Sequence, residues 1–318
     1  MLVFLAKRLG VMILTALCLT LVVFSLVNLK PNLVKLAKEQ NNNRMTDQQV
    51  EVWLDQNGFN RPMLVRYGEW LGDLAQGDLG HSTRFSAPVA EVLFPRLALT
   101  GVLMFWVLVV MIPSALVLGV LAGMREGSFQ DRALSTVAIG TTSTPEYVSG
   151  VVLTVIFASQ IVGLQWFSGS ATSAADTGPT LFNFTLPVLT IAIYGMGYIA
   201  RMTRASMAEV MTQQYIRTAR LKGVSFYGVV LKHALRNALI APFTVIMLQF
   251  PWLLTGVVIV ETLFNYRGFG WLLIEAAANN DIDLLLACSI VAVVIVLVTQ
   301  LISDIGYVYL NPRIRVSG

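Results

Sequence analysis

The sequence is dominated by long apolar runs that a water-soluble fold could not bury. Six of them lie at 9–29, 97–124, 134–164, 181–200, 238–260 and 284–303. A helix needs roughly 20 mostly apolar residues to cross a bilayer. Charged residues make up 13% of the chain, against about 25% in a typical soluble domain. A membrane β-barrel would instead need many alternating strands of about 10 residues. We therefore predict an all-α, polytopic membrane protein with six transmembrane helices.

The first run begins after two basic residues, as a secretory signal peptide does. Its apolar core is longer than the roughly 7–15 residues of such a peptide. The segment that follows, Leu29-Lys30-Pro31-Asn32, offers no small-residue cleavage site. We therefore expect this run to be kept as the first transmembrane helix.

Basic residues predict the orientation, because Lys and Arg are enriched in cytoplasmic loops. With six spans, both termini lie on one side, together with the following basic residues: Lys7, Arg8, Arg125, Arg132, Arg201, Arg204, Arg217, Arg220, Lys222, Lys232, Arg236, Arg313 and Arg315. The short loops on the other side, 165–180 and 261–283, carry one basic residue, Arg267. Both termini are therefore predicted to be cytoplasmic.

These assignments divide the chain into four parts. Residues 1–29 form the N-terminal transmembrane helix, and 30–96 form a small helical subdomain outside the membrane. Residues 97–310 form the transmembrane core, which contains a long cytoplasmic loop at 201–237. Residues 311–318 form a cytoplasmic tail.

The sequence lacks the motifs of common catalytic and metal sites. No His, Cys and carboxylate cluster has metal-ligand spacing, and no Gly-Xaa-Ser-Xaa-Gly elbow is present. No lysine follows any of the 24 glycines, so the phosphate-binding Gly-Lys-Ser/Thr loop is missing. We predict no catalytic residue, no metal and no cofactor in this chain. Uphill transport would then draw on an ion gradient or on a partner chain.

Two acids within the apolar runs are candidates for an ion-coupled mechanism. A charged side chain inside a bilayer costs at least about 2.5–3.5 kcal/mol and so indicates function. Asp304 is interpreted as a helix-end carboxylate that reaches water or pairs with Arg313. Glu146 follows Pro145, and two interpretations are weighted equally for it: structural pairing or cavity lining, and a direct transport role. Two sparse acids make a poor proton relay, which favours the partner-chain route.

Small residues and the cytoplasmic loop carry two further patterns. Ala115, Gly119 and Gly123 are spaced four apart, which predicts a close helix approach. The loop 201–237 is basic and keeps a helical pattern, with a helix stop at Gly223. Such a surface suits either docking into a partner's groove or an interfacial helix held by anionic lipid.

This loop resembles the "EAA" loop of ATP-binding-cassette importer permeases, and in particular that of the dipeptide/oligopeptide/nickel family. The resemblance rests on Tyr215-Ile216-Arg217-Thr218-Ala219-Arg220-Leu221-Lys222-Gly223, followed by His233-Ala234-Leu235-Arg236-Asn237-Ala238. Shorter matches occur in family order along nearly the whole chain: Arg8-Leu9-Gly10, Asn60-Arg61-Pro62-Met63, Gly77-Asp78-Leu79-Gly80, Arg201-Met202-Thr203-Arg204, Glu261-Thr262-Leu263-Phe264 and Asn311-Pro312-Arg313-Ile314-Arg315.

The resemblance implies a fold, a set of partners and a mechanism. Such a type I importer permease lies in the inner or plasma membrane of a bacterium or archaeon. It forms the channel with a second, homologous permease chain. Two ATPase subunits bind ATP and Mg²⁺ below the membrane, and a periplasmic or lipid-anchored binding protein delivers the solute. Lipid is the remaining partner, and nucleic acid is not expected.

By the same resemblance, particular residues of the loop couple transport to ATP hydrolysis. These are Arg217, Ala219, Arg220, Lys222 and Gly223. The three basic residues are expected to contact the ATPase, Ala219 to pack closely and Gly223 to provide the turn. Glu146 is the candidate residue of the translocation path. The substrate stays open among peptides, nickel complexes, opines and sugar derivatives. An ion-coupled transporter working without an ATPase is the alternative function.

The external segment 30–96 also shows helical patterns. Thr46-Asp47-Gln48-Gln49 reads as a capping box, which predicts a helix with Val50 and Leu54 on one face and an end at Asn57-Gly58. A second helix is predicted after Pro62. The segment is either a small cap on the membrane surface or a docking surface for a binding protein.

Overall fold

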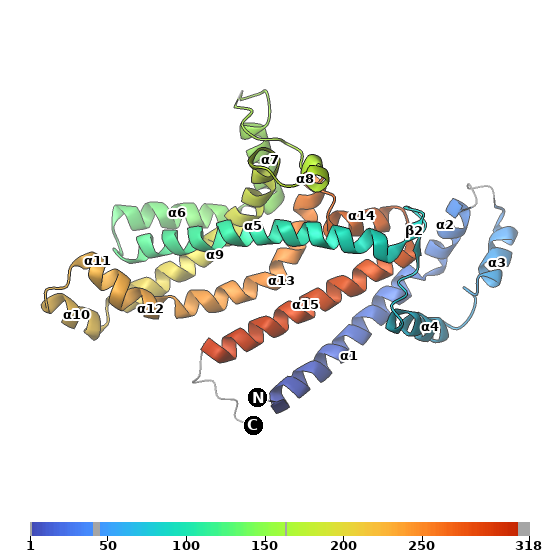
Figure 1. The fold of residues 1–318 in the computed structure, drawn as a ribbon, viewed down its shortest axis with the longest axis horizontal. Helices are drawn as coiled ribbons and strands as arrows, with labels where there is room; N and C mark the ends of the chain where they lie inside the picture. The colour runs from blue at the N-terminus through green and yellow to red at the C-terminus, as the bar shows by residue number, and fades with distance from the viewer. Residues whose placement is uncertain (1, 41–44, 163, 311–318) are drawn as a thin grey trace. The chain divides into compact units, whose positions relative to one another are not determined.

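The computed structural model describes residues 2–40, 45–162 and 164–310, which form helices joined by short connections (Figure 1). In this described part, the strands are β1 (His81–Ser82) and β2 (Ala87–Pro88), which pair antiparallel as one hairpin. The predicted all-α class is therefore confirmed. The predicted tail 311–318 lies outside the described residues. The chain divides into two compact units, each described here by itself.

The first unit comprises residues 1–99 and 267–298. Its elements are α1 (Leu2–Val27), α2 (Lys30–Gln40), α3 (Asp47–Gln56), α4 (Met63–Ala75), the β-hairpin, the start of α5 (Val89–Gly123), α14 (Phe269–Ala278) and the first part of α15 (Ile282–Leu310). A core of apolar side chains joins α1, α2, α3 and α15, and includes Phe24, Leu36, Val50, Leu54 and Leu286.

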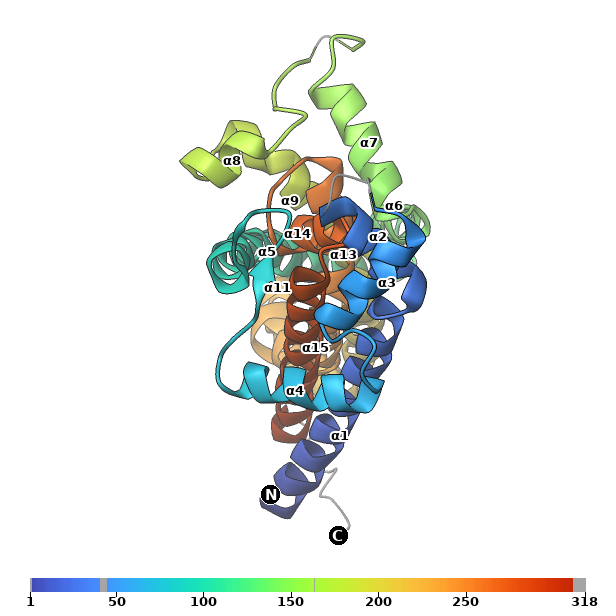
Figure 2. The ribbon, with the colours of Figure 1, turned by 90° about the vertical axis from the view of Figure 1, so that its right-hand side faces the viewer.

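The segment 30–96, which the sequence predicts to be external, contains the helices that its pattern predicts. The Thr46 side chain accepts from the Gln49 amide and the Gln49 side chain accepts from the Thr46 amide, which completes the capping box of α3. Val50 and Leu54 are buried, and Gly58 follows the helix end with a positive φ of 73°. Helix α4 lies across α1 (Figure 2), and the Tyr67 hydroxyl is 2.8 Å from the Thr20 hydroxyl.

The second unit comprises residues 100–266 and the end of the chain from 299. Besides the rest of α5 and α15, its elements are α6 (Phe129–Ser143), α7 (Glu146–Phe157), α8 (Thr172–Thr177), α9 (Leu181–Met211), α10 (Gln214–Leu221), α11 (Phe226–Gly228), the π-helix η1 (Val229–Ala234), α12 (Leu235–Ala238) and α13 (Ile240–Leu263). Helix α9 is the centre of this unit, because α6, α7 and α13 all pack against it (Figure 1).

Four helices among the described residues are long and apolar enough to cross a bilayer, namely α1, α5, α9 and α15. A fifth candidate span is the bent pair Phe226–Ala238 and Ile240–Leu253, whose two parts meet at 49°. The protein is therefore a multi-pass membrane protein. Several of these helices extend beyond the predicted apolar runs, because polar residues continue the same helix at its ends.

The prediction of a single third span over 134–164 is wrong in one respect. The run forms two helices, since α6 ends at Ser143 and α7 begins at Glu146. Thr144 is extended, with φ −100° and ψ 122°, because the ring of a following proline disfavours the helical region. Helix α7 has 12 residues, fewer than the roughly 20 that a full crossing needs.

Small residues bring α5 and α9 into close contact, as their spacing predicts. A Cβ atom on Gly119 would lie 2.6 Å from the Ala200 carbonyl oxygen. One on Gly123 would lie 2.5 Å from the Arg204 carbonyl oxygen. Ala115, on the same face, is fully buried. Because backbone atoms occupy the space, any larger residue at the two glycines would push the helices apart.

Candidate functional site

The segment 201–237, named the coupling-loop region after the role that its sequence predicts, begins as an extension of α9. Helix α9 continues through 201–211, and the short helix α10 follows after Thr212 and Gln213. Ile216 and Ala219 on α10 are buried, with 1% and 6% of their surface exposed. They belong to an apolar cluster that also contains Met124, Met207, Val229, Val230, Ala234 and Ala238. The apolar face of α10 is thus packed on α9 and η1, and its position is fixed.

The opposite face of α10 is free within the described residues. Arg217, Arg220 and Lys222 are all exposed. Leu221 stands among them with 80% of its surface exposed. Arginine is enriched among the residues that dominate binding at interfaces, so an exposed cationic surface held on a buried base suits docking to a partner. The structure therefore separates the predicted residues, because Ala219 lies inward and the three basic residues lie outward.

Gly223 ends α10 in the left-handed conformation, with φ of 80°. Its amide donates to the Arg220 carbonyl at 3.0 Å, and the Val224 amide donates to the Ala219 carbonyl at 3.2 Å. Such a C-terminal cap favours glycine, because other residues pay a steric penalty at positive φ. No heavy atom lies within 4 Å of a Cβ placed there. The backbone conformation therefore favours glycine at position 223, whereas the surroundings leave room for a side chain.

The return segment is a π-helix, which the sequence pattern did not reveal. The Ser225 side chain accepts from the Gly228 amide and begins α11, and η1 continues to Ala234. The Arg125 guanidinium lies 5.0 Å from the centre of the Phe226 ring, in cation–π geometry. The Asn237 amide donates to the Tyr215 hydroxyl at 2.9 Å, which joins α10 to α12.

A buried ion pair beside this loop is a second feature that sequence reasoning missed. Asp131, at the start of α6, is 3% exposed. It accepts two hydrogen bonds from Arg204 on α9, from Nε at 3.0 Å and from a terminal nitrogen at 2.8 Å. The Gly127 amide and the Ser135 hydroxyl donate to the same carboxylate at 2.9 and 3.1 Å. Hydrogen bonding by the Arg204 guanidinium holds the pKa of Asp131 well below its usual range.

This pair fastens the turn between α5 and α6 to the end of α9 that carries the coupling-loop region. Glu126, in the same turn, is 3.4 Å from Arg204. A Ser128 cap and the bidentate contact at Asp131 together fix the start of α6. The sequence contains a signal for the acid, because Asp131 follows a Gly-Ser turn. Nothing in the sequence identifies Arg204, 73 residues later, as its partner.

Glu146 lies at the first turn of α7, just after the break between α6 and α7. It is half-buried and faces α13, where a Cβ on Gly256 would lie 3.2 Å from Glu146 Oε2. The carboxylate is placed where helix N-terminal amides favour negative charge. Because Gly256 has no side chain, α13 leaves room for the Glu146 carboxylate.

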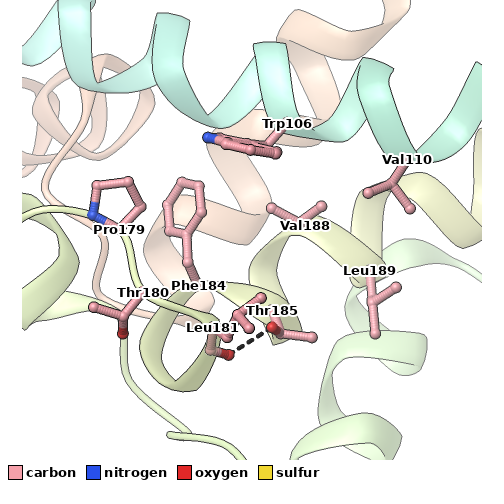
Figure 3. Close-up of a pocket in the computed structure, with 9 residues that line it drawn as sticks. All are labelled: Trp106, Val110, Pro179, Thr180, Leu181, Phe184, Thr185, Val188 and Leu189. Carbon is pink, nitrogen blue, oxygen red and sulfur yellow. Dashed lines mark hydrogen bonds between the residues drawn. The ribbon is translucent and has the colours of Figure 1, made fainter.

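Among the cavities beside α9 in this unit, two differ sharply in character. One has a volume of about 550 Å³ and is lined by polar and aromatic side chains from the end of α6, from α9 and from α13. The other, about 430 Å³, lies between α5 and the start of α9 (Figure 3). Trp106 and Val110 face Phe184 and Val188 across it, and its lining is almost wholly apolar. An apolar cavity suits hydrocarbon or a neighbouring apolar side chain, whereas the first cavity suits a polar solute.

Comparison with known proteins places this geometry in context. Residues 115–316 match the family described as binding-protein-dependent transport system inner membrane component. The chain is 33% identical to a putative peptide permease protein of Brucella ovis over 95% of both chains. It is also 33% identical to the oligopeptide transport system permease protein AppB of Bacillus subtilis, over 83% of this chain and 84% of that one. A probable peptide ABC transporter permease protein of Sinorhizobium fredii is 33% identical over 85% and 86%.

Proposed function

Because this chain belongs to the family of binding-protein-dependent transport system inner membrane components, we propose that ATPase subunits drive it through the coupling-loop region. The chain is a permease subunit of an ABC importer of type I fold. The alternative of an ion-coupled transporter working alone is not favoured, since the relatives are permease subunits.

One observation carries the coupling proposal, namely that α10 presents cationic residues and Leu221 on a face whose reverse side is buried. Burying a side chain such as Ile216 contributes about 1.5–3 kcal/mol, so α10 is held firmly on its base. A force applied to the exposed face is therefore passed to α9, and from α9 through Asp131 to α6. Arg217, Arg220 and Lys222 are the proposed contacts to the ATPase.

The proposed assembly contains a second permease chain, two ATPase subunits and a substrate-binding protein. ATP and Mg²⁺ bind the ATPase subunits, since this sequence contains no phosphate-binding loop. The basic coupling-loop region and both termini then lie on the cytoplasmic side. Alternating access follows when closure of the ATPases shifts the helices between two states.

The proposed substrate is a peptide. The supporting observation is that the relatives named above are described as peptide or oligopeptide permeases. The polar cavity beside α9 provides room for a small peptide inside this unit.

A substitution at Gly223 tests the coupling proposal. We expect Gly223→Val to leave membrane insertion intact but to abolish ATPase-driven uptake, because a β-branched residue resists a positive φ and would displace the end of α10. Gly223→Asn is the matched control, since asparagine tolerates this conformation. Insertion, uptake and ATPase activity are measured in the complete importer with its binding protein. Normal uptake by the valine variant would refute the proposal.

A further inference from the structure

The polar cavity has the features of a built binding site. Its walls come from three helices, with Thr142 and Ser143 at the end of α6, Tyr194 and Arg201 on α9, and residues of α13 opposite. The helix end at Ser143 leaves this side of α6 open, because the chain is extended at Thr144 before α7 begins. The break in the third apolar run thus contributes directly to the cavity.

The middle of the cavity offers stacking and hydrogen bonding. The rings of Tyr194 and Trp252 stack with centroids 4.7 Å apart and an angle of 18° between their planes. Gln249 lies one turn before Trp252 and is 8% exposed. Within the described residues its amide makes no hydrogen bond, so its donor and acceptor serve the cavity. No buried side-chain nitrogen or oxygen among the described residues lacks a partner, so the Gln249 amide is open to the cavity, where a ligand can bond to it.

Two opposite charges lie at or beside the cavity, because Arg201 lines it and Glu146 lies next to it on the α13 side. Arg201 lines the cavity near Gln249, and its guanidinium has no ion-pair or hydrogen-bond partner in the part of the chain that the structure describes. Beyond the residues that line the cavity, Gly256 lies one turn after Trp252 on the same face of α13, and Glu146 Oε2 is 3.2 Å from its Cβ position. Glu146 also lacks a partner among the described residues.

The distance between the two charged groups can be estimated along α13, because Gln249 lies near Arg201 and Gly256 lies next to Glu146. Gln249 and Gly256 are seven residues apart, which is about 10 Å along α13 at 1.5 Å per residue. An extended chain of about three residues spans the same distance at roughly 3.3–3.6 Å per residue. An ammonium group and a carboxylate at the two ends of such a chain would reach Glu146 and Arg201.

We propose that this cavity is a solute-binding subsite for a short extended peptide with free termini, its ammonium group at Glu146 and its carboxylate at Arg201. The peptide's amide groups bond to Gln249, and its side chains lie on the Tyr194–Trp252 stack. This inference rests on the proposed function as a peptide importer. It gives a partner to Glu146, which is half-buried and unpaired within the described residues, since an unpaired charge inside a membrane is expensive.

Occupancy of the cavity can be measured by chemical protection. Ser143→Cys places a thiol on the cavity wall, and its labelling by a maleimide is followed in the purified permease–ATPase assembly with increasing trialanine. Ser170→Cys, in an exposed loop outside the cavity, is the matched control. The parent chain gives the background from Cys18 and Cys288. We expect trialanine to slow labelling at 143 and to leave labelling at 170 unchanged.

Two comparisons test the charge assignment. N-acetyl-trialanine lacks the ammonium group, so it should need about tenfold more peptide for half-protection, a difference of about 1.4 kcal/mol. In Glu146→Gln, free and N-acetylated trialanine should protect equally. The control is Asp176→Asn, which removes an exposed acid on α8 and should keep the tenfold preference for the free peptide. C-amidated trialanine lacks the carboxylate, so it should also need more peptide for half-protection than free trialanine. In Arg201→Gln, free and C-amidated trialanine should protect equally.

The outcomes separate the two proposals. If the complete importer takes up trialanine but the peptide does not protect position 143, the subsite is refuted while peptide import stands. Equal protection by free and acetylated peptide in the parent would also refute it. If neither uptake nor peptide-stimulated ATPase activity occurs with trialanine and longer peptides, peptide import fails and the subsite fails with it.

Discussion

The ion pair between Asp131 and Arg204 gives the sharpest stability prediction. In Asp131→Asn the side chain keeps its shape, but one of its two acceptor oxygens becomes an amide donor. In either orientation of the amide, that donor would face a nitrogen of the Arg204 guanidinium, which is itself a donor. The substitution therefore removes the bidentate charge-assisted contact and adds a repulsive one.

The magnitude follows from the burial of the two partners. Breaking a fully buried pair costs about 3–5 kcal/mol. The Asp131 side chain is 4% exposed but that of Arg204 is 31% exposed, so water can solvate part of the freed charge. We therefore expect a loss of about 2–3 kcal/mol in the free energy of unfolding. Glu126→Gln is the control. Glu126 is 56% exposed, so its contact with Arg204 should contribute about 0–1 kcal/mol.

The assay is unfolding of the purified importer, followed at several pH values. Asp131 has a folded-state pKa below its unfolded value, so its contribution is present above the unfolded pKa and disappears as the pH falls through the folded pKa. At pH 7, Asp131→Asn should unfold much more readily than Glu126→Gln. At strongly acidic pH, the parent and Asp131→Asn should converge. Equal stability of the two variants at pH 7 would refute this reasoning.

Three further predictions concern helix packing and the coupling-loop region. Gly119→Val should lower the free energy of unfolding by at least about 1–3 kcal/mol, because its side chain would meet α9 backbone; Gly101→Val, where a Cβ meets nothing within 4 Å, is the control. Ile216→Ala should cost about 2–5 kcal/mol and release α10, detected as faster proteolysis at 212–224. Leu221→Ser should leave unfolding unchanged but reduce ATPase-driven uptake, measured with expression held equal; unchanged uptake would show that Leu221 makes no functional contact.

Much of the fold follows from local sequence signals. Apolar runs locate most of the spans, the capping box at Thr46 locates α3, and the small residues at Gly119 and Gly123 locate the close approach of α5 and α9. These signals are readable because each depends on residues within one or two helical turns. Pro145 is also a local signal for the break at Thr144. The prediction of a single span over 134–164 rested on hydropathy and did not use this signal.

The arrangement of the candidate sites depends on pairs that are distant in sequence. Asp131 meets Arg204, Glu146 meets Gly256, and Tyr194 stacks on Trp252, and no spacing rule relates their positions. The π-helix η1 was also missed, because a single extra residue in a helical turn leaves the apolar pattern almost unchanged. Sequence did identify Glu146, since a lone acid within an apolar run is conspicuous, but it could not identify what the acid faces.

The central claim is that α10 transmits force from an ATPase. A photo-crosslinking amino acid in place of Leu221, in the complete importer, tests it most directly. The matched control replaces Leu64, which is 68% exposed on α4 in the segment predicted to be external. We expect light to join position 221 to an ATPase subunit, and position 64 to no ATPase. Crosslinks from position 221 to lipid or to the permease chains alone, in an importer that hydrolyses ATP and transports, would contradict the account.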